Sequence, residues 1–540
     1  MTTPDVARYR ILLLTMAAMG GALYGYDLGI IGAALLYLDK SIVLSITQLS
    51  LIVAAVMAGS TLSSLIAGVC ADWLGRRTVA ILAGVLFLFS VLIMCFANNF
   101  TFLLCGRLLQ GLSGGMVAVV IPLYLAECLP AGVRGRGTAL FQLALTIGIM
   151  LAMGVGALFA AHVDAVAATK DAAALATTQD HAWRWMFATA AIPGVLFLIG
   201  CFLIAESPRW LQRRGRSTEA FAALSRSLPA DEAKIELASI ATSLPNQNTP
   251  RDSLFKRRYI VPFLLACAIL ALTQATGINS VLQYIVVILR QSGFTESMAA
   301  NAAFAVTVVN VVFTILALFL VDRKGRTYLL KIGTGGVIIS LCLCAVVFNR
   351  FEAQTKDVTS TIISKVTADG LHYIVEPLND IPQRLSVVYD NGTGSTMTSA
   401  ASSDQNATVH IASIINKPFI INSARQGPQP STSTGWLAMG CLMLFIASFA
   451  IGPGVCVWLA LSELMPTRIR ATGMGIALVL NQGVATGIAA VFLPVVGSVG
   501  YAAMFLGWAG ATMIYFLIAA FILPETKGRT LEDIERHFNK

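Results

Sequence analysis

Twelve long apolar segments dominate this 540-residue chain. Each is near the roughly 20 residues that a helix needs to cross the hydrocarbon core of a bilayer. Only 12% of the residues are charged, whereas soluble domains carry about a quarter. We therefore expect an all-α membrane protein with twelve transmembrane helices. The segments span residues 11–36, 48–70, 78–97, 101–125, 138–161, 184–204, 260–289, 299–321, 328–348, 436–464, 471–496 and 500–523.

A polar stretch at residues 206–258 divides the segments into two groups of six. We expect two six-helix halves, residues 1–205 and 259–540, joined by a cytoplasmic linker. Amphipathic helices are expected in this linker at residues 217–228 and 230–240, where they would lie against the ends of the bundle.

Two segments are expected as inserts on the external side. Residues 162–182 lie between the fifth and sixth apolar segments, and residues 349–435 separate the ninth and tenth. Alternating polar and apolar residues at 385–389 are typical of a strand. An extracytoplasmic loop of this length is either a small folded cap or disordered.

Short loops rich in lysine and arginine follow every second segment. Examples are Arg76-Arg77, Arg323 to Arg326 and Lys527 to Arg529. Because basic residues are retained on the cytoplasmic face of a membrane, we expect these loops and both termini in the cytoplasm. The formal net charge of +9 thus reflects topology and not a nucleic-acid surface. The expected location is a plasma membrane or a bacterial inner membrane.

Two motifs occur once in each half. Asp72 precedes Gly75-Arg76 after the second segment, and Asp322 precedes Gly325-Arg326 after the eighth. A Glu-to-Arg spacing of seven residues also recurs, after the fourth and the tenth segments. Duplicated halves related about the membrane normal are a transporter architecture, with the substrate held between them.

The charged residues of these motifs are expected to pair at the helix ends and to close the cytoplasmic side. The arginines also hold their loops in the cytoplasm, but that role does not explain the repeated carboxylates. The candidate gate residues are Asp72, Arg76, Arg77, Glu127, Arg134, Glu206, Arg209, Asp322, Arg326, Glu463, Arg470 and Glu525.

Asp27 is the only charged residue between Arg10 and Asp39, near the middle of the first segment. A carboxylate at this depth needs a partner, a water-filled cavity or a proton. Its role is either functional or that of a buried structural ion pair.

Seven motifs together resemble the sugar porter family of the major facilitator superfamily, over nearly the whole chain outside the two external inserts. They are Gly25-Tyr26-Asp27, Ala71 to Arg77, Pro122 to Glu127, Glu206 to Trp210, Gln274 to Asn279, Gly452-Pro453-Gly454 and Pro524 to Gly528. The resemblance implies a carrier of a monosaccharide, hexose or pentose, or of a polyol such as myo-inositol.

The resemblance also implies which side chains contact the substrate. Amides both donate and accept hydrogen bonds, so they can satisfy sugar hydroxyls that have lost water. A lone amide in a membrane helix can equally bond a neighbouring helix. The implied contacts are Tyr24, Gln142, Gln274, Asn279, Gln283, Asn310, Trp458 and Asn481.

The chain departs from the family pattern at several of these positions. Thr273 replaces the first glutamine of a pair, and Gln283 replaces a tyrosine. Gln482 stands where tryptophan is frequent, so the pocket wall of the C-terminal half is altered. These departures leave the identity of the sugar or polyol open.

In proton-coupled members of the family, Asp27 and Arg107 match a membrane-embedded pair. The expected mechanism is that protonation of Asp27 releases Arg107 and permits the conformational change. A facilitative uniporter with a structural Asp27–Arg107 pair and a non-transporting sugar sensor are the alternatives. We expect a functional monomer with no cofactor or metal, and not an enzyme, since no nucleophile–base constellation is present.

Overall fold

The computed structural model describes residues 3–129, 131–242, 257–367, 370–390, 395–402, 408–412, 420–465 and 470–525. Within these ranges, twelve helical spans are long and apolar enough to cross a membrane. The prediction of twelve transmembrane helices is therefore confirmed.

The N-terminal half and the linker are helical. The half contains α1 (Thr3–Ser41), α2 (Ile46–Leu74), α3 (Arg76–Cys95), α4 (Phe100–Cys128), α5 (Ala131–Ala167), α6 (Ala172–Thr189) and α7 (Ala191–Leu203). The linker contains α8 (Pro208–Arg213), α9 (Ser217–Ser227) and α10 (Ala230–Thr242). Residues 162–182, which read as an external insert, instead extend α5 and begin α6, with a hydrogen-bonded Asp171 cap at the start of α6.

The C-terminal half repeats the six-span layout with a π-helical turn at its end. It contains α11 (Arg257–Ala275), α12 (Ile278–Gln291), α13 (Glu296–Lys324), α14 (Arg326–Glu352), α16 (Thr432–Ile451), α17 (Pro453–Leu464), α18 (Arg470–Val499), α19 (Tyr501–Leu517) and η1 (Ile518–Ile522).

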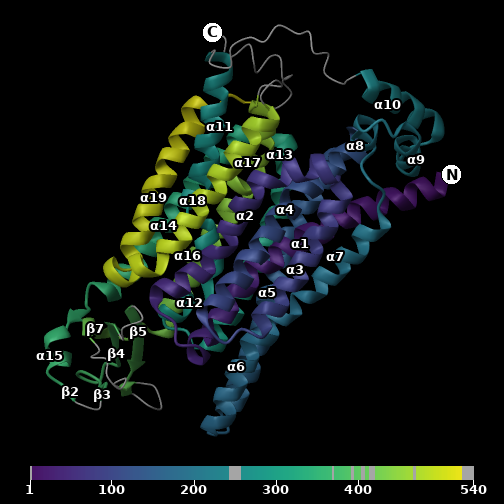
Figure 1. The fold of residues 1–540 in the computed structure, drawn as a ribbon. Coiled ribbons are helices and arrows are strands. Elements are labelled where there is room, and N and C mark those ends of the chain that lie inside the picture. Colours follow the sequence, from purple (N-terminus) through teal and green to yellow (C-terminus); the bar gives the residue numbers. More distant parts are fainter. Residues whose placement is uncertain are drawn as a thin grey trace.

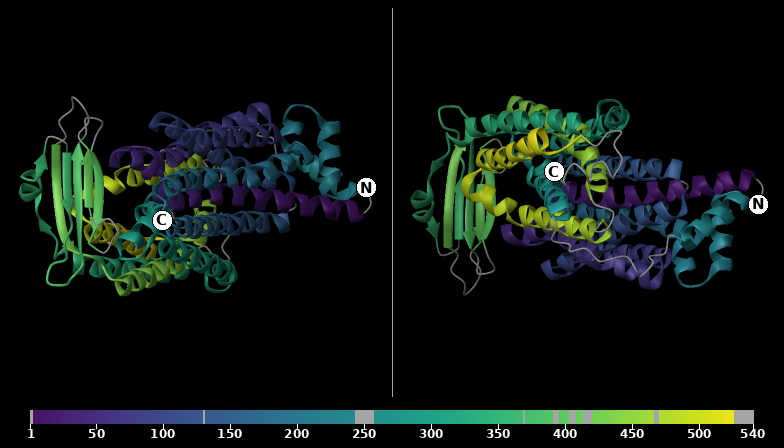
Figure 2. Two further views of the ribbon diagram at one scale, coloured as in Figure 1. Left: turned by 90° about the horizontal axis from the view of Figure 1, so that it is seen from below. Right: turned by 90° about the horizontal axis from the view of Figure 1, so that it is seen from above.

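The linker helices and the insert lie at opposite ends of the helical bundle (Figure 1). We call these ends the linker side and the insert side. Figure 2 shows the strands gathered at the end of the molecule away from the N-terminus.

The described part of the inserted domain (residues 353–431) contains two antiparallel sheets and one short helix, α15 (Thr359–Ile363). One sheet has the order β1-β7-β4-β5 and the other β2-β3-β6. The domain has its own apolar core, which includes Leu371, Leu385 and Val387. The strands are β1 (Lys356–Asp357), β2 (Val366–Thr367), β3 (Gly370–Ile374), β4 (Gln383–Asp390), β5 (Ser395–Ala401), β6 (Thr408–Ala412) and β7 (Ile420–Pro428).

The seventh apolar segment, expected as one helix, is broken in two. Gly277 adopts a left-handed conformation with φ of 82°, between α11 and α12. Such a φ favours glycine because a Cβ would clash with the backbone. Here a Cβ would also overlap the ring of Trp508. The break makes α12 a separate 14-residue helix.

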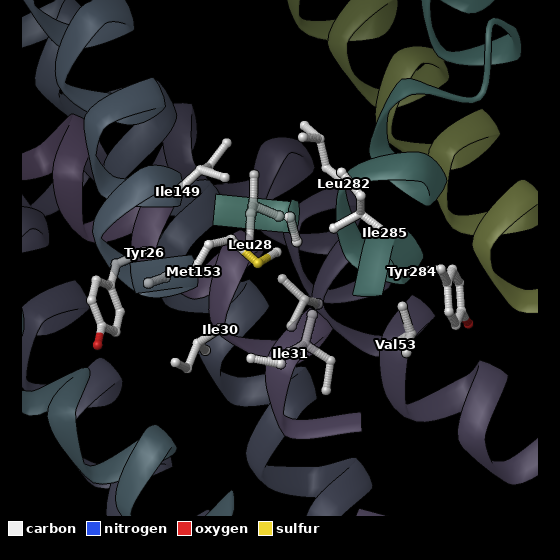
Figure 3. Packing of buried hydrophobic residues seen from close by; sticks show 14 of the residues in the cluster. Tyr26, Leu28, Ile30, Ile31, Val53, Ile149, Met153, Leu282, Tyr284 and Ile285 are labelled. Carbon is white, nitrogen blue, oxygen red and sulfur yellow. The ribbon is translucent and has the colours of Figure 1, made fainter. Parts of the chain in front are cut away.

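Close helix packing places α1 at the centre of the molecule. A Cβ on Gly21 or Gly25 would overlap the backbone of α5, so these glycines allow the two helices to touch. On the other side, α1 contacts α12 of the C-terminal half. Figure 3 shows Leu28 and Ile31 of α1 between Met153 of α5 and Ile285 of α12. The halves also meet where α2 contacts α18 and α5 contacts α13.

Candidate substrate and proton site

A fully buried ion pair joins α1 and α4. Arg107 Nη1 lies 2.9 Å from Asp27 Oδ1, and both side chains are 0% exposed. The same nitrogen donates to Gln110 Oε1 at 2.9 Å, and the guanidinium lies 5.8 Å from the centre of the Phe187 ring. Asp27 Oδ2 and Arg107 Nε and Nη2 have no hydrogen-bond partner among the described residues. Few contacts therefore hold the pair in place. Separating the two side chains would be costly, because each would then be a buried charge without a partner.

A chain of amide side chains occupies the centre of the C-terminal half. Asn279 Nδ2 donates to Gln274 Oε1 at 2.7 Å, and Gln274 Nε2 donates to Asn481 Oδ1 at 3.2 Å. Asn481 is anchored by a 2.9 Å bond from its Nδ2 to the carbonyl of Leu270. Because α12 starts just after Gly277, its first turn brings Asn279 back beside Gln274. The break in the helix therefore builds the amide cluster.

Gln283 lies one turn beyond Asn279 on α12. Its Nε2 donates to the carbonyl oxygen of Asn279 at 3.2 Å, while its buried Oε1 has no partner in the described part of the chain. Asn279 also reaches the N-terminal half, where its Nδ2 lies 3.9 Å from Met57 Sδ. The cluster thus borders the interface between the halves and retains an acceptor for a ligand.

Tyr24 connects the ion pair to the opposite half. It lies one helical turn before Asp27, and its hydroxyl accepts from Gln482 Nε2 at 3.2 Å. Gln482 Oε1 is buried and has no described partner. The sequence showed Gln482 only as a departure from the family pattern, so its role as a contact was missed.

Two candidate contacts are not joined to the amide cluster in the described structure. Gln142 is half-buried on α5 and Asn310 is buried on α13, and neither is hydrogen-bonded to a described residue. The side chain of Trp458, on α17, lies outside the described part of the structure.

Charged residues on the linker side form contacts within the N-terminal half. Arg76 Nη2 lies 2.7 Å from Asp72 Oδ1, and Arg76 Nε lies 3.0 Å from Glu127 Oε2. Glu206 Oε1 accepts from the backbone N–H groups of Arg76 and Arg77, at 2.9 and 3.1 Å. This places a carboxylate at the start of α3, where the helix dipole favours negative charge.

The C-terminal half repeats this capping arrangement. Glu525 accepts from the backbone N–H groups of Arg326 and Thr327, both at 3.1 Å, at the start of α14. In the linker, Arg209 lies 3.9 Å from Glu236. The side chains of Arg134, Asp322, Glu463 and Arg470 lie outside the described part of the structure.

The insert side has an ion cluster that the sequence did not reveal as a site. Lys40 of α1 lies 2.6 Å from Glu296 of α13, and Arg290 of α12 lies 3.6 Å from the same carboxylate. The Lys40 pair crosses between the halves, whereas the Arg290 pair stays within the C-terminal half. In the sequence, Lys40, Arg290 and Glu296 are visible only as charged residues that flank apolar segments.

Comparison with known proteins identifies the family that this arrangement belongs to. A family model described as "Sugar (and other) transporter" matches residues 13–367 and 409–538. The chain is a member of the sugar porter family of the major facilitator superfamily. The resemblance seen in the sequence motifs is confirmed, and the chain is a membrane transporter, not an enzyme. Residues 368–408 of the inserted domain fall outside the matched ranges.

Curated relatives cover almost the whole sugar porter chain. The glucose transporter GlcP of Staphylococcus epidermidis is 29% identical, over 97% of this chain and 96% of its own length. The probable inositol transporter 2 of Arabidopsis thaliana is 30% identical, over 98% and 91%. Among solved structures, a partially occluded inward-open form of the xylose transporter XylE from E. coli matches with a TM-score of 0.70. It is 21% identical, and the match covers 97% of this chain and 100% of XylE, which supports the fold.

Proposed function

We propose that this sugar porter carries a monosaccharide, a hexose or pentose, by proton symport through alternating access. In this proposal the linker side and both termini face the cytoplasm. The observation that carries it is the Asp27–Arg107 pair, which is fully buried between two membrane-spanning helices. A charge in the membrane interior is a functional-site hypothesis by default.

The proton would act on the contact between Asp27 and Arg107. Protonation removes the carboxylate charge, and Arg107 then retains its bond to Gln110 and its contact with Phe187. Tyr24, one turn before Asp27, bonds to Gln482 of the other half. A shift of α1 after protonation would therefore change a contact between the halves, as alternating access requires.

The amide cluster supports a polyhydroxylated, uncharged substrate. Gln283 and Gln482 each present a buried carbonyl oxygen without a described partner, and Gln142 supplies a further amide. Buried polar groups of this kind are stabilised when a ligand supplies the missing hydrogen bond. The names of the relatives, which include glucose and inositol transporters, agree with this class of substrate.

Transport by purified protein in proteoliposomes tests the proposal. Radiolabelled glucose, xylose and myo-inositol are offered with and without an imposed pH gradient. We expect accumulation of one of them against its gradient only when protons flow inward. Uptake indifferent to the pH gradient would exclude symport and leave facilitated uniport.

Replacement of Asp27 by asparagine isolates the coupling step. We expect Asp27→Asn to retain counterflow exchange but to lose gradient-driven accumulation, because the side chain no longer takes up a proton. Asp180→Asn is the matched control. It also removes a carboxylate 2.9 Å from an arginine, Arg184, but at a partly exposed site. Normal accumulation by Asp27→Asn would make Asp27 a structural residue.

A further inference from the structure

A chamber of about 1060 Å³ lies between the inserted domain and the insert side of the bundle. Its walls come from the ends of α1, α12, α14, α18 and α19, and its roof from β4, β5 and β7. The volume is at the upper end of the roughly 300–1,000 Å³ typical of small-molecule sites. Both halves of the transporter contribute to the walls.

Strand alternation gives the roof a polar surface. Successive side chains of a strand point to opposite faces. On β4, Leu385 and Val387 lie in the core of the inserted domain, while Arg384 and Ser386 line the chamber. The neighbouring strands continue this surface with the hydroxyl groups of Ser399, which pairs with Ser386, and Ser423, which pairs with Val388.

These hydroxyls are left without a partner. Ser386, Ser399 and Ser423 lie on the chamber face of three neighbouring strands, and none of their hydroxyls is hydrogen-bonded to a described residue. A hydroxyl both donates and accepts, so it can bond a hydroxyl of a solute in either direction. The roof thus offers several groups of the kind that bind sugars and polyols.

The charged groups of the chamber are largely engaged within the protein. Arg384 donates to Gln291 Oε1 on α12 at 2.9 Å, and Arg425 donates to the carbonyl of Ser498 on α18 at 2.9 Å. Glu352 accepts from the backbone N–H groups that start α19. Lys40 and Arg290 contact Glu296, as described above, and both also interact electrostatically with Asp39, which lines the chamber. Because these charged groups are engaged within the protein and the serine hydroxyls are open, the chamber favours a neutral solute.

We propose that the chamber is a second, outer binding site for neutral polyhydroxylated solutes. This inference rests on the proposed function, because it assigns the chamber the same solute class as the central site. Helix α12 connects the two sites: Asn279 and Gln283 lie near its start, and Val287 and Gln291 line the chamber near its end. Its 14 residues span about 21 Å at the 1.5 Å rise of an α-helix.

Protection of an engineered cysteine tests for solute in the chamber. Ser386→Cys is made in a Cys342→Ala background, which removes the native cysteine that lines the chamber. Reconstituted full-length protein is treated with a membrane-impermeant thiol reagent. We expect glucose, xylose or myo-inositol to slow modification at least twofold in a saturable manner. Glycine betaine, a solute without hydroxyl groups, should not slow it, and Ser399→Cys, on the chamber face of β5, is a second reporter should Ser386→Cys fold poorly.

Two controls make the result specific to the chamber. Ser364→Cys, exposed on the same domain but away from the chamber, should react at the same rate with and without sugar. Protection of Ser386→Cys should persist when Asn279→Ala weakens the central site. Absence of protection, loss of protection with Asn279→Ala, or equal protection at Ser364→Cys would each overturn the proposal.

Counterflow by the parent protein is measured separately. If it fails for every sugar tested, the proposed function fails, whereas the protection assay still reports on the chamber.

Discussion

At the scale of single residues, Gly25 fixes the position of Asp27, the candidate proton site. A Cβ at Gly25 would overlap the carbonyl of Leu145 on α5. We expect Gly25→Ala to destabilise the protein by roughly 1–3 kcal/mol, the usual cost of overpacking. Because Asp27 lies two residues further on, transport should fall as well. Thermal unfolding in detergent and initial uptake rates measure the two effects.

Gly483 of α18 provides the matched control for this substitution. Nothing lies within 4 Å of a Cβ built there. Replacement of a helical glycine by alanine at an open position is favourable by up to about 1 kcal/mol. Equal unfolding temperatures for Gly25→Ala and Gly483→Ala would show that α1 and α5 can separate without cost.

The residues of the candidate site were recognisable in the sequence where a single side chain is anomalous. Asp27 and Arg107 stand out as charges in apolar segments, and Gln274 and Asn279 belong to a short motif. The Tyr24–Gln482 bond was not predictable, since it joins residues 458 positions apart. Which half-buried polar groups meet depends on the packing of the two halves, which local sequence does not encode.

At the scale of elements, carboxylates cap equivalent helices in the two halves. Glu206 caps α3 and Glu525 caps α14, each by accepting two backbone N–H bonds. We expect Glu206→Ala to lower the free energy of unfolding by roughly 1–2 kcal/mol, as loss of a helix cap does. Glu525→Ala should cost a similar amount because the geometry is repeated. Thermal unfolding of both variants measures the effect.

Glu219 is the control carboxylate for the capping prediction. It pairs with Arg216 on the exposed surface of the linker, where ion pairs contribute at most about 1 kcal/mol. If Glu219→Ala destabilises as much as Glu206→Ala, the capping bonds are not responsible for the effect.

Length and hydropathy predicted the twelve spans but not their interruptions. The apolar runs continue through Gly277 and Gly452, so hydropathy gives no sign that α12 and α17 are separate helices. Glycine adopts several backbone conformations readily, and tertiary contacts select the left-handed one at Gly277. The alternating residues at 385–389 do lie in β4, but the sheet order of the inserted domain depends on pairings between strands up to dozens of residues apart.

At the scale of the whole molecule, polar contacts between the halves occur at two levels in the described structure. Tyr24–Gln482 and Thr61–Thr486 lie within the bundle, and Lys40–Glu296 lies on the insert side. The close approach of Gly32 to the carbonyl of Gln283 also brings α1 against α12. In the proposed alternating access, outward opening of the insert side breaks the Lys40–Glu296 pair, because the pair joins the two halves that separate.

Removal of the Lys40 charge should therefore favour the outward-facing state. The side chains of Lys40 and Glu296 are 32% and 24% exposed, so the pair contributes about 0.2–1 kcal/mol. We expect Lys40→Met to raise the outward-facing population by up to about fivefold. Spin labels at Val43→Cys and Val499→Cys, with Cys105 and Cys342 replaced by alanine, report the opening as a longer interlabel distance.

Arg290→Met separates this effect from a general loss of charge. This substitution removes the arginine that lies 3.6 Å from Glu296. Arg290 belongs to the same half as Glu296, so its loss breaks no contact between the halves. We expect the distance distribution of Arg290→Met to match that of the parent protein. An equal shift in both variants would mean that the charge of the cluster, and not the link between the halves, holds the insert side closed. A shift in Lys40→Met alone would identify this ion pair as the contact that opposes outward opening.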